Sequence, residues 1–401
     1  MKVAFVTSFP RDPAAPQGGV EAVSVNLVAS LAQLPDMDIH VVSLDSQLRS
    51  SATAGFGRAR VYRLPARKGS TLLNATITGR RTVCNFLRKL KPDVVHSHDT
   101  YGLMVKGLAM PRVFTIHGFI HADTLVSGSK LPKLRSRVWK LIETAGWADQ
   151  PHIIAISPYV RKRVSGVAKG VIHDIENPVS ESFFNLKRNE DPRIIFSSAV
   201  ISPRKNTLAL IDAFKIVADE GRHLQLRLAG RIADPGYGRR VEERIQAMNI
   251  RPKVSLLGEI SSERVRSELS RSAVYALVSL EENAPMGIEE AMAAGVPVLA
   301  SNRCGMPFMV RHGETGFLVD PQDKYDIAAR LRLLLDNQSL RETMAVRART
   351  HALERYHPQK VALRTRDVYE EAIRSNHFAS AHSRRFDLRN ATAAPGSAEH
   401  K

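Results

Sequence analysis

The sequence predicts an α/β protein made of two successive Rossmann-like domains, each a doubly wound parallel sheet, with a cleft between them. Short apolar runs typical of buried strands alternate with helical periodicity along most of the chain. A polar stretch bracketed by prolines interrupts this alternation at 178–192, after which it restarts. The length of 401 residues suits two domains of ordinary size, which we place at 1–180 and 190–356.

The elements follow in order along each half. In the first half, strands are predicted at 2–7, 38–44, 60–64, 92–98, 112–118 and 152–157, and helices at 18–34, about 77–90 and 134–148. The segment 158–164 follows the last of these strands. In the second half, strands are predicted at 193–198, 224–230, 254–259, 274–280 and 296–301, and helices at 206–219, about 239–248, 261–271 and 287–294. Helices near 323–336, 338–354 and 358–374 end the folded part. We expect the polar stretch from 375 to 401 to be disordered.

Composition limits the class of protein. Hydrophobic residues make up 43% of the chain, which is typical of a soluble globular protein. The two cysteines, Cys84 and Cys304, are far apart and lack companion ligands, so we expect neither a disulfide framework nor a thiolate zinc site. The apolar start of the chain is too short for a signal peptide, and no run reaches the ~18 apolar residues of a membrane span. The predicted location is therefore the cytoplasm.

Positive charge is concentrated in the first domain. The formal net charge is +18, and no acidic residue occurs between Asp45 and Asp93. Basic residues gather in that interval, notably at 58–68, and again at Lys130, Lys133, Arg135, Arg137 and Lys140. Such a field attracts nucleic acid, an anionic membrane or acidic glycans. The alternative, a merely solvated basic surface, stays open. The low aromatic content of 6% argues against a dedicated nucleic-acid binder.

Several chemistry-bearing residues follow predicted strands, where doubly wound sheets bind ligands. Gly18 and Gly19 open a helix after the first strand, so their backbone N–H groups could face an anion. His117 ends the strand at 112–118 and could hydrogen-bond a sugar hydroxyl or a leaving group. For His96 and His98, on the neighbouring strand, we expect a structural role or support of the residues that touch a ligand, because their spacing is not a metal signature.

The second half carries the stronger signals. Arg204 and Lys205 place two cations at a predicted helix start, a combination suited to a diphosphate. Glu282 and Glu290 flank another helix start, where one carboxylate could bind sugar hydroxyls and the other both hydroxyls of a ribose. Glu281 and Glu289 are interpreted only as acidic residues favoured at helix starts.

The order and spacing of these pieces resemble retaining glycosyltransferases of family 4 (glycosyltransferase group 1), over residues 1 to about 374. The matching pieces are QGGVE, PDVVHSHD, FTIHG, IAISPYV, SPRKN, the two glutamates before and within EAMAAGVPV, and HGETGFLVDPQD. The resemblance implies the GT-B fold, in which two Rossmann-like domains face each other and a C-terminal helix, here 357–374, returns to the first domain.

The resemblance also implies roles for single residues. Glu290 would hold the donor ribose, Glu282 would contact the donor sugar, and Lys205 would bind the diphosphate. His117 would touch the sugar or reacting centre, and Gly258 would lie beside the base. The remaining donor-binding residues would be Gly18, Gly19, Arg204, Gly230, Asn283, Met286 and Gly287. No metal or cofactor is expected, so the Asp36-to-Asp38 motif is interpreted as accidental.

The sequence departs from the family pattern at two places. Ala199 and Val200 stand where the family usually has an arginine, for which Arg204 would substitute. Pro285 lacks an N–H, so phosphate donation would come from Met286 and Gly287.

The implied activity is transfer of a hexose from a UDP- or GDP-sugar to a hydroxyl, with retention, and with the leaving phosphate helping to deprotonate the acceptor. The basic first domain predicts a glycan or lipid-linked acceptor at an anionic membrane, as in synthesis of lipopolysaccharide, exopolysaccharide or glycolipid. Two alternatives remain: a soluble transferase of small molecules, and a non-catalytic protein that binds nucleotide sugars or polyanions.

Overall fold

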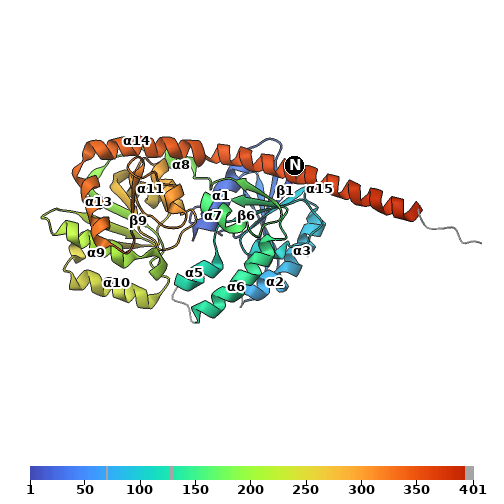
Figure 1. The fold of residues 1–401 in the computed structure, drawn as a ribbon, viewed down its shortest axis with the longest axis horizontal. Helices are drawn as coiled ribbons and strands as arrows, with labels where there is room; N and C mark the ends of the chain where they lie inside the picture. Colours follow the sequence, from blue (N-terminus) through green and yellow to red (C-terminus); the bar gives the residue numbers. More distant parts are fainter. Residues whose placement is uncertain (69–70, 127–130, 393–401) are drawn as a thin grey trace, which may run out of the picture.

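The computed structural model describes residues 1–68, 71–126 and 131–392 and contains two α/β domains side by side (Figure 1). Each domain is built on its own sheet, one of eight strands and one of six. The prediction of two successive parallel-sheet domains is therefore confirmed.

The first sheet has the strand order β3-β4-β2-β1-β5-β6-β7-β8. All its neighbours are parallel except the edge pair β3 and β4. The edge strand β3 and the far strand β8 were not predicted. The bounds are β1 Lys2–Val6, β2 Asp38–Asp45, β3 Ala52–Phe56, β4 Ala59–Pro65, β5 Val94–His98, β6 Arg112–Ile116, β7 His152–Ala155 and β8 Val171–Asp174.

The second sheet has the order β11-β10-β9-β12-β13-β14 and is parallel throughout. Strand β14, which covers only four residues, was not predicted. The bounds are β9 Asp191–Ser198, β10 Gln225–Ala229, β11 Val254–Gly258, β12 Ser272–Leu277, β13 Val298–Ser301 and β14 Gly316–Val319. Central strands such as β12 are buried at every residue, as expected for parallel strands covered on both faces.

Helices cover both faces of each sheet. Several begin where their sequences favour it: α7 starts with a proline, and the Ser157 side chain accepts a hydrogen bond from Val160 N–H. In the first domain the helices are α1 Gly19–Leu31, α2 Thr71–Thr76, α3 Thr78–Leu90, α4 Tyr101–Met104, α5 Ile120–Val126, α6 Pro132–Trp147 and α7 Pro158–Val164. The others are α8 Glu181–Phe184, α9 Thr207–Ala218, α10 Pro235–Ala247, α11 Ser262–Arg271, α12 Met286–Ala293, α13 Lys324–Asp336, α14 Gln338–Arg355 and α15 Pro358–Thr392.

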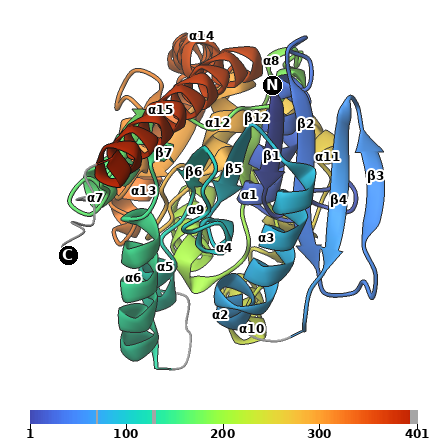
Figure 2. The same cartoon turned by 90° about the vertical axis from the view of Figure 1, so that its right-hand side faces the viewer.

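The last helix joins the two domains. In Figures 1 and 2, α14 lies over the second domain and α15 continues across the first. Glu176 forms ion pairs with Arg355 on α14 and Arg364 on α15, each at 2.8 Å. The Tyr369 hydroxyl on α15 is hydrogen-bonded to His96 Nδ1 at 2.7 Å. These contacts place α15 against the first sheet.

The predicted end of this helix was wrong. The sequence prediction stopped it at 374 and made 375–401 irregular, but α15 continues to Thr392. Residues 375–392 contain no glycine or proline, so nothing in them breaks a helix that has already formed. The rest of that predicted tail, 393–401, lies outside the described residues, as does Lys130 of the basic run. Within the described part of the chain, no helix is long and apolar enough to cross a bilayer.

Candidate functional site

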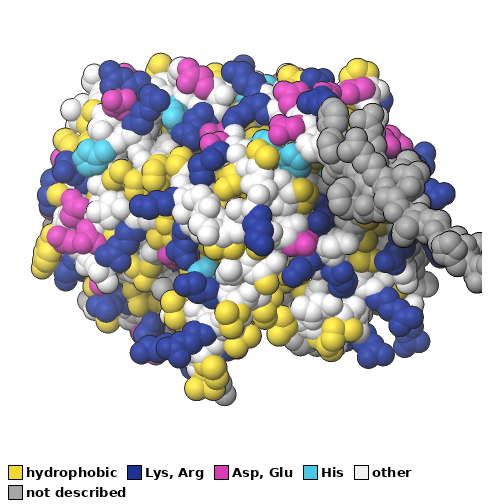
Figure 3. Space-filling view, turned by 45° about the vertical axis from the view of Figure 1, so that its right-hand side comes forward, with side chains coloured by type: hydrophobic (Ala, Val, Ile, Leu, Met, Phe, Trp, Pro, Cys, Tyr) yellow, Lys and Arg dark blue, Asp and Glu magenta, His cyan; other side chains and the backbone are white. Residues whose placement is uncertain are grey.

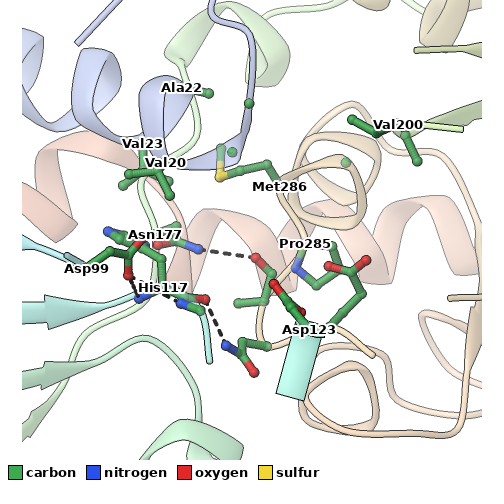
Figure 4. A pocket seen from close by; sticks show the side chains of 18 of the residues that line it. Val20, Ala22, Val23, Asp99, His117, Asp123, Asn177, Val200, Pro285 and Met286 are labelled. Carbon is green, nitrogen blue, oxygen red and sulfur yellow. Dashed lines mark hydrogen bonds between the residues drawn. The ribbon is translucent and has the colours of Figure 1, made fainter. Parts of the chain in front are cut away.

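A cavity of about 650 Å³ opens at the carboxyl ends of the two sheets and is lined from both domains (Figure 4). His117 and Asp99 reach it from the ends of β6 and β5, and Glu282 reaches it from the loop after β12. Strand ends of both domains therefore meet at one place, as the sequence predicts for a ligand site.

Two helix N-termini point into this cavity. Helix α1 begins at Gly19 and α12 at Met286, and a Cβ atom on Gly19 would lie 3.8 Å from Met286 Cγ. Among the described hydrogen bonds, none is donated by the N–H groups of Gly18, Gly19, Met286 or Gly287. The first N–H groups of a helix lack intrahelical partners and favour an anion. The two helix starts thus form a ready-made anion site.

Close backbone approaches make two predicted glycines necessary here. A Cβ on Gly287 would lie 2.0 Å from the Tyr275 hydroxyl. Gly230 has a φ of +139°, and its Cβ would lie 2.0 Å from the carbonyl oxygen of Ala199. Both glycines line the cavity, whereas Gly258 does not: its carbonyl accepts the N–H of Gly230 at 2.7 Å, and its neighbour Glu259 lines the cavity instead.

The two predicted cations surround Glu282. Lys205 Nζ donates to Glu282 Oε1, and Arg204 Nη1 lies 3.1 Å from the same oxygen. Arg204 also donates to the carbonyl of Glu281 at 2.8 Å. Burial alone would raise the pKa of Glu282, but the two cations outweigh it and hold that pKa below its usual value. The carboxylate is therefore ionised, and it positions both cations at the anion site.

Glu290 lies one turn inside α12 and lines the same cavity. No described residue donates a hydrogen bond to its carboxylate. Burial raises its pKa to about 8, with Arg266 opposing the shift. A carboxylate without a partner, facing a cavity, is ready to accept hydrogen bonds from ligand hydroxyls.

The interpretation of Glu289 as a simple helix-start charge was wrong. Its side chain is fully buried, and its pKa is raised well above the usual value, chiefly by burial and also by Glu176 and Glu290. Asn177 Nδ2 lies 3.5 Å from Glu289 Oε1, and Glu289 Oε2 has no described partner. Helix α12 is apolar on most sides, so this position faces the core rather than solvent.

We expect Glu289→Gln to be at least as stable as the wild type at pH 8. A carboxyl with a raised folded pKa contributes its full stability below its unfolded pKa and loses it as the pH rises through the folded value. The amide does not titrate, so the gap between variant and wild type should widen from pH 5 to pH 8 in chemical denaturation. A pH-independent loss of about 0.3–1 kcal/mol would instead indicate a helix-start charge.

His117 lines the cavity as a neutral group. Its Nε2 lies 3.0 Å from His98 Nδ1, and burial lowers its pKa to about 4. Asp99, at a φ of +44°, accepts the N–H groups of His117 and Gly118 with one carboxylate oxygen (Figure 4). Burial raises the pKa of Asp99 to about 7. His96 and His98 are fully buried, as expected for structural residues.

Asp99, Asp123 and Asn177 are among the cavity residues that sequence reasoning missed. Asp99 had a signal in the sequence, since it ends the matching piece PDVVHSHD. The structure adds that its backbone adopts a conformation unusual for a residue other than glycine. Asp123 on α5 lies 3.7 Å from Arg204 across the cleft. Asn177 donates to the carbonyl of Ala284 at 3.4 Å. Neither of these two lies next to a predicted strand end, so the sequence held no signal for them.

The loop that carries Glu282 is fastened to the first domain. Asn283 Nδ2 donates to the carbonyl of His117 at 2.9 Å, and Ser157 Oγ donates to the carbonyl of Asn283 at 3.0 Å. Asn283 was predicted to bind the donor. It does line the cavity, but its amide joins the two domains.

The part of the cavity within the first domain is mostly apolar. Trp139, Trp147 and Phe114 line it together with Leu103 and Ile120. The cations therefore gather on the side of the second domain, and a mostly apolar wall, to which α6 contributes its two tryptophans, closes the other side.

A histidine–carboxylate cluster lies elsewhere. His152, His173 and Glu371 bring their ligand atoms within 4.8 Å of one another, on β7, β8 and α15. None of the three lines the cavity. Asp36 and Asp38 lie at the start of β2, at the opposite end of the sheet from the cavity. That the site works without a metal stays a prediction.

Two family models match the chain and together cover residues 17–351. Residues 17–183 match Glycosyltransferase Family 4, and residues 179–351 match Glycosyl transferases group 1. The MMP alpha-(1->4)-mannosyltransferase of Mycolicibacterium hassiacum is 26% identical over 386 residues, covering 89% of this chain and 88% of its own.

Solved structures of glycosyltransferases share the fold. Sucrose-phosphate synthase from Thermosynechococcus elongatus superposes with a TM-score of 0.80 at 20% identity, covering 93% of this chain and 99% of its own. Anabaena Alr3699/HepE, solved in complex with UDP-glucose, gives 0.67 at 16% identity, covering 92% and 99%. The predicted GT-B fold is thereby confirmed.

Proposed function

Because the chain belongs to glycosyltransferase family 4 (glycosyltransferase group 1), we propose that it transfers a hexose from a UDP- or GDP-sugar to a hydroxyl acceptor with retention at the anomeric carbon. The observation that carries this proposal is the unpartnered carboxylate of Glu290 beside the α12 N-terminus. It offers a ribose site next to a diphosphate site.

The second domain would hold the nucleotide. Glu290 would accept hydrogen bonds from both ribose hydroxyls. The diphosphate would lie between the starts of α1 and α12, where backbone N–H groups and Lys205 reach it. This placement directs fixed positive charge at the phosphate oxygen on which negative charge develops as its bond to the sugar breaks.

The reacting centre would lie between the domains. Glu282, held by Lys205 and Arg204 and lining the cavity, would accept hydrogen bonds from sugar hydroxyls. His117, neutral because of its lowered pKa, could donate or accept a hydrogen bond but could not serve as a strong acid. The leaving phosphate would take the acceptor proton on the face that it vacates. We propose these steps without a metal, since the helix N-terminus and the two cations would supply the positive charge.

The acceptor would approach from the first domain, where the cavity is apolar. We place the enzyme in synthesis of a cell-surface glycan, with a glycan or lipid-linked acceptor and with peripheral contact of the basic first domain at an anionic membrane. The excess of basic residues supports this placement. A soluble transferase of small molecules is the second candidate, because the cavity is large enough to enclose a small acceptor.

Binding of UDP or GDP to the wild type should tighten as the pH rises from 6 to 8. Ribose hydroxyls bind the ionised form of Glu290, whose pKa is about 8 without ligand. Each nucleotide bound at pH 7 therefore releases a proton, and affinity should rise by up to about tenfold per pH unit. Calorimetry in buffers of different ionisation enthalpy measures both effects.

Glu290→Gln is the matched control, since the amide keeps the shape of the side chain but does not titrate. The variant should bind the nucleotide more weakly, and its affinity should lose most of the dependence on pH. The dependence that remains comes from titration of the nucleotide phosphates. If the wild type and Glu290→Gln bind nucleotide with the same pH profile, Glu290 does not hold the ribose, and the donor site is wrongly assigned.

A further inference from the structure

The outer face of α6 is apolar but uncovered. Leucine and valine side chains spaced three or four residues apart form one row along this helix. Such a row normally packs against a core, but here it is exposed: Leu134 60%, Val138 42% and Leu141 73%. Leu131, directly before the helix, is 71% exposed. Helices rarely expose an aligned apolar row unless something covers it.

Cations flank this row on both sides. At 100° per residue, Lys133, Arg137 and Lys140 project on one side of the row and Arg135 on the other. None of the four forms an ion pair with a described residue. The one acidic residue of α6, Glu143, points inward and is buried against His121 Nδ1 at 2.6 Å. The exposed face of α6 therefore combines apolar side chains with cations and carries no acidic side chain.

A second helix adds to the same end of the molecule. Leu73 on α2 is 44% exposed, and Ile77, between α2 and α3, is 61% exposed. The exposed Arg67 and Lys68 precede α2. Figures 1 and 2 show α2 and α6 both reaching the lower edge of the first domain. Yellow and dark blue side chains gather along this edge in Figure 3.

We propose that these residues of α2 and α6, the α2–α6 surface, seat the first domain on an anionic membrane. Exposed aliphatic side chains beside cations, without anions, match an interface where acyl chains begin below negatively charged headgroups. An apolar protein partner would need the leucines but would gain nothing from uncompensated cations on both sides of the row.

The position of α6 links this surface to the cavity. Its opposite face, with Trp139, Glu143 and Trp147, forms the cavity wall, so one helix diameter separates the exposed row from the interior. If the proposed function is right, the acceptor side of the cavity lies beside the membrane, and the acceptors belong to the lipid-linked class.

The α2–α6 surface includes the second basic run that the charge pattern indicated, on α6, but only the end of the first run. The basic run at 58–68 is not a single patch, because both terminal nitrogens of Arg63 donate to the carbonyls of Phe9 and Pro10. Arg67 and Lys68, at the end of that run, adjoin α2 and belong to the proposed surface.

Vesicle co-sedimentation tests the proposal. We expect the full chain to bind vesicles of phosphatidylglycerol and phosphatidylcholine, and phosphatidylcholine alone much more weakly. The double variant Leu134→Glu with Leu141→Glu should bind the anionic vesicles at least about tenfold more weakly. Its matched control is Val346→Glu with Leu353→Glu on α14, which replaces exposed apolar side chains of the second domain and should bind as the wild type does.

Fluorescence locates the contact. The chain has two tryptophans, Trp139 and Trp147, and both lie on α6. Both line the cavity, one helix diameter from the exposed row, so brominated lipids in the vesicles should quench the emission of the wild type and the α14 variant in part, and that of the α6 variant not at all.

Three results would overturn the proposal: no binding to anionic vesicles, equal binding by the α6 variant, or a dimer in solution that the α6 substitutions dissociate. Nucleotide release without acceptor, measured on the same samples, is independent of the surface. The α6 variant should keep it. If vesicle binding is intact but no sample releases nucleotide, the proposed function fails while the α2–α6 surface stands.

Discussion

Lys205→Met should lower kcat for sugar transfer by about 10²–10³-fold while the protein stays folded. Lys205 carries the charge closest to Glu282 at the anion site, and removing one such preorganised donor typically costs about that much. Methionine keeps the apolar stem, so little packing is lost. Because the diphosphate charge grows as the bond to the sugar breaks, kcat should fall more than the affinity for the donor.

The control for this variant is Lys215→Met on α9. Lys215 pairs with Asp219 on an exposed face of the same domain and does not line the cavity, so its replacement should leave turnover unchanged. Steady-state kinetics and thermal denaturation of both variants check the prediction. If Lys205→Met raises only the KM for the donor and keeps kcat, Lys205 does not act on the leaving group.

Gly287→Ala should weaken nucleotide binding by about 100-fold. An added Cβ would overlap the Tyr275 hydroxyl at 2.0 Å, so the first turn of α12 must move by about an ångström. Losing two hydrogen bonds to a charged ligand, each worth about 1.5 kcal/mol, corresponds to about that factor in affinity. The moved turn carries the N–H groups of Met286 and Gly287 on which the anion site depends.

Tyr275→Phe should partly rescue this variant. Removing the hydroxyl leaves contacts of 3.0 Å to the ring and 3.1 Å to Ser198 Oγ, which small shifts can relieve. The double variant should therefore bind nucleotide at least about tenfold more tightly than Gly287→Ala, by calorimetry. If Tyr275→Phe rescues nothing, the backbone of α12 is not the phosphate ligand.

Elements with strong local signals were predictable from the sequence. Apolar runs such as β1 and β6, and helices such as α9 and α11, lie close to where the pattern placed them. Strand β3 was missed because Ala52–Phe56 is short, largely exposed and contains a glycine. Helix α5 covers only seven residues, too few to establish a period.

The candidate site was predictable where a residue followed a strand end. Lys205, Glu282 and Glu290 meet in the cavity because β9 and β12 are neighbours in the second sheet. Glu289 was misinterpreted because the helix-start rule is local, whereas burial depends on what packs around α12. Asn177 and Asp123 enter through tertiary contacts that the sequence does not encode locally.

The most direct test of the account is nucleotide release by the purified protein from a panel of UDP- and GDP-sugars, with and without EDTA. Water can replace the acceptor, so a donor can be identified before the acceptor is known. The account predicts EDTA-resistant release from one donor and its loss in Glu290→Gln. Release that depends on a metal, or release that Glu290→Gln retains in full, would contradict the donor site described above.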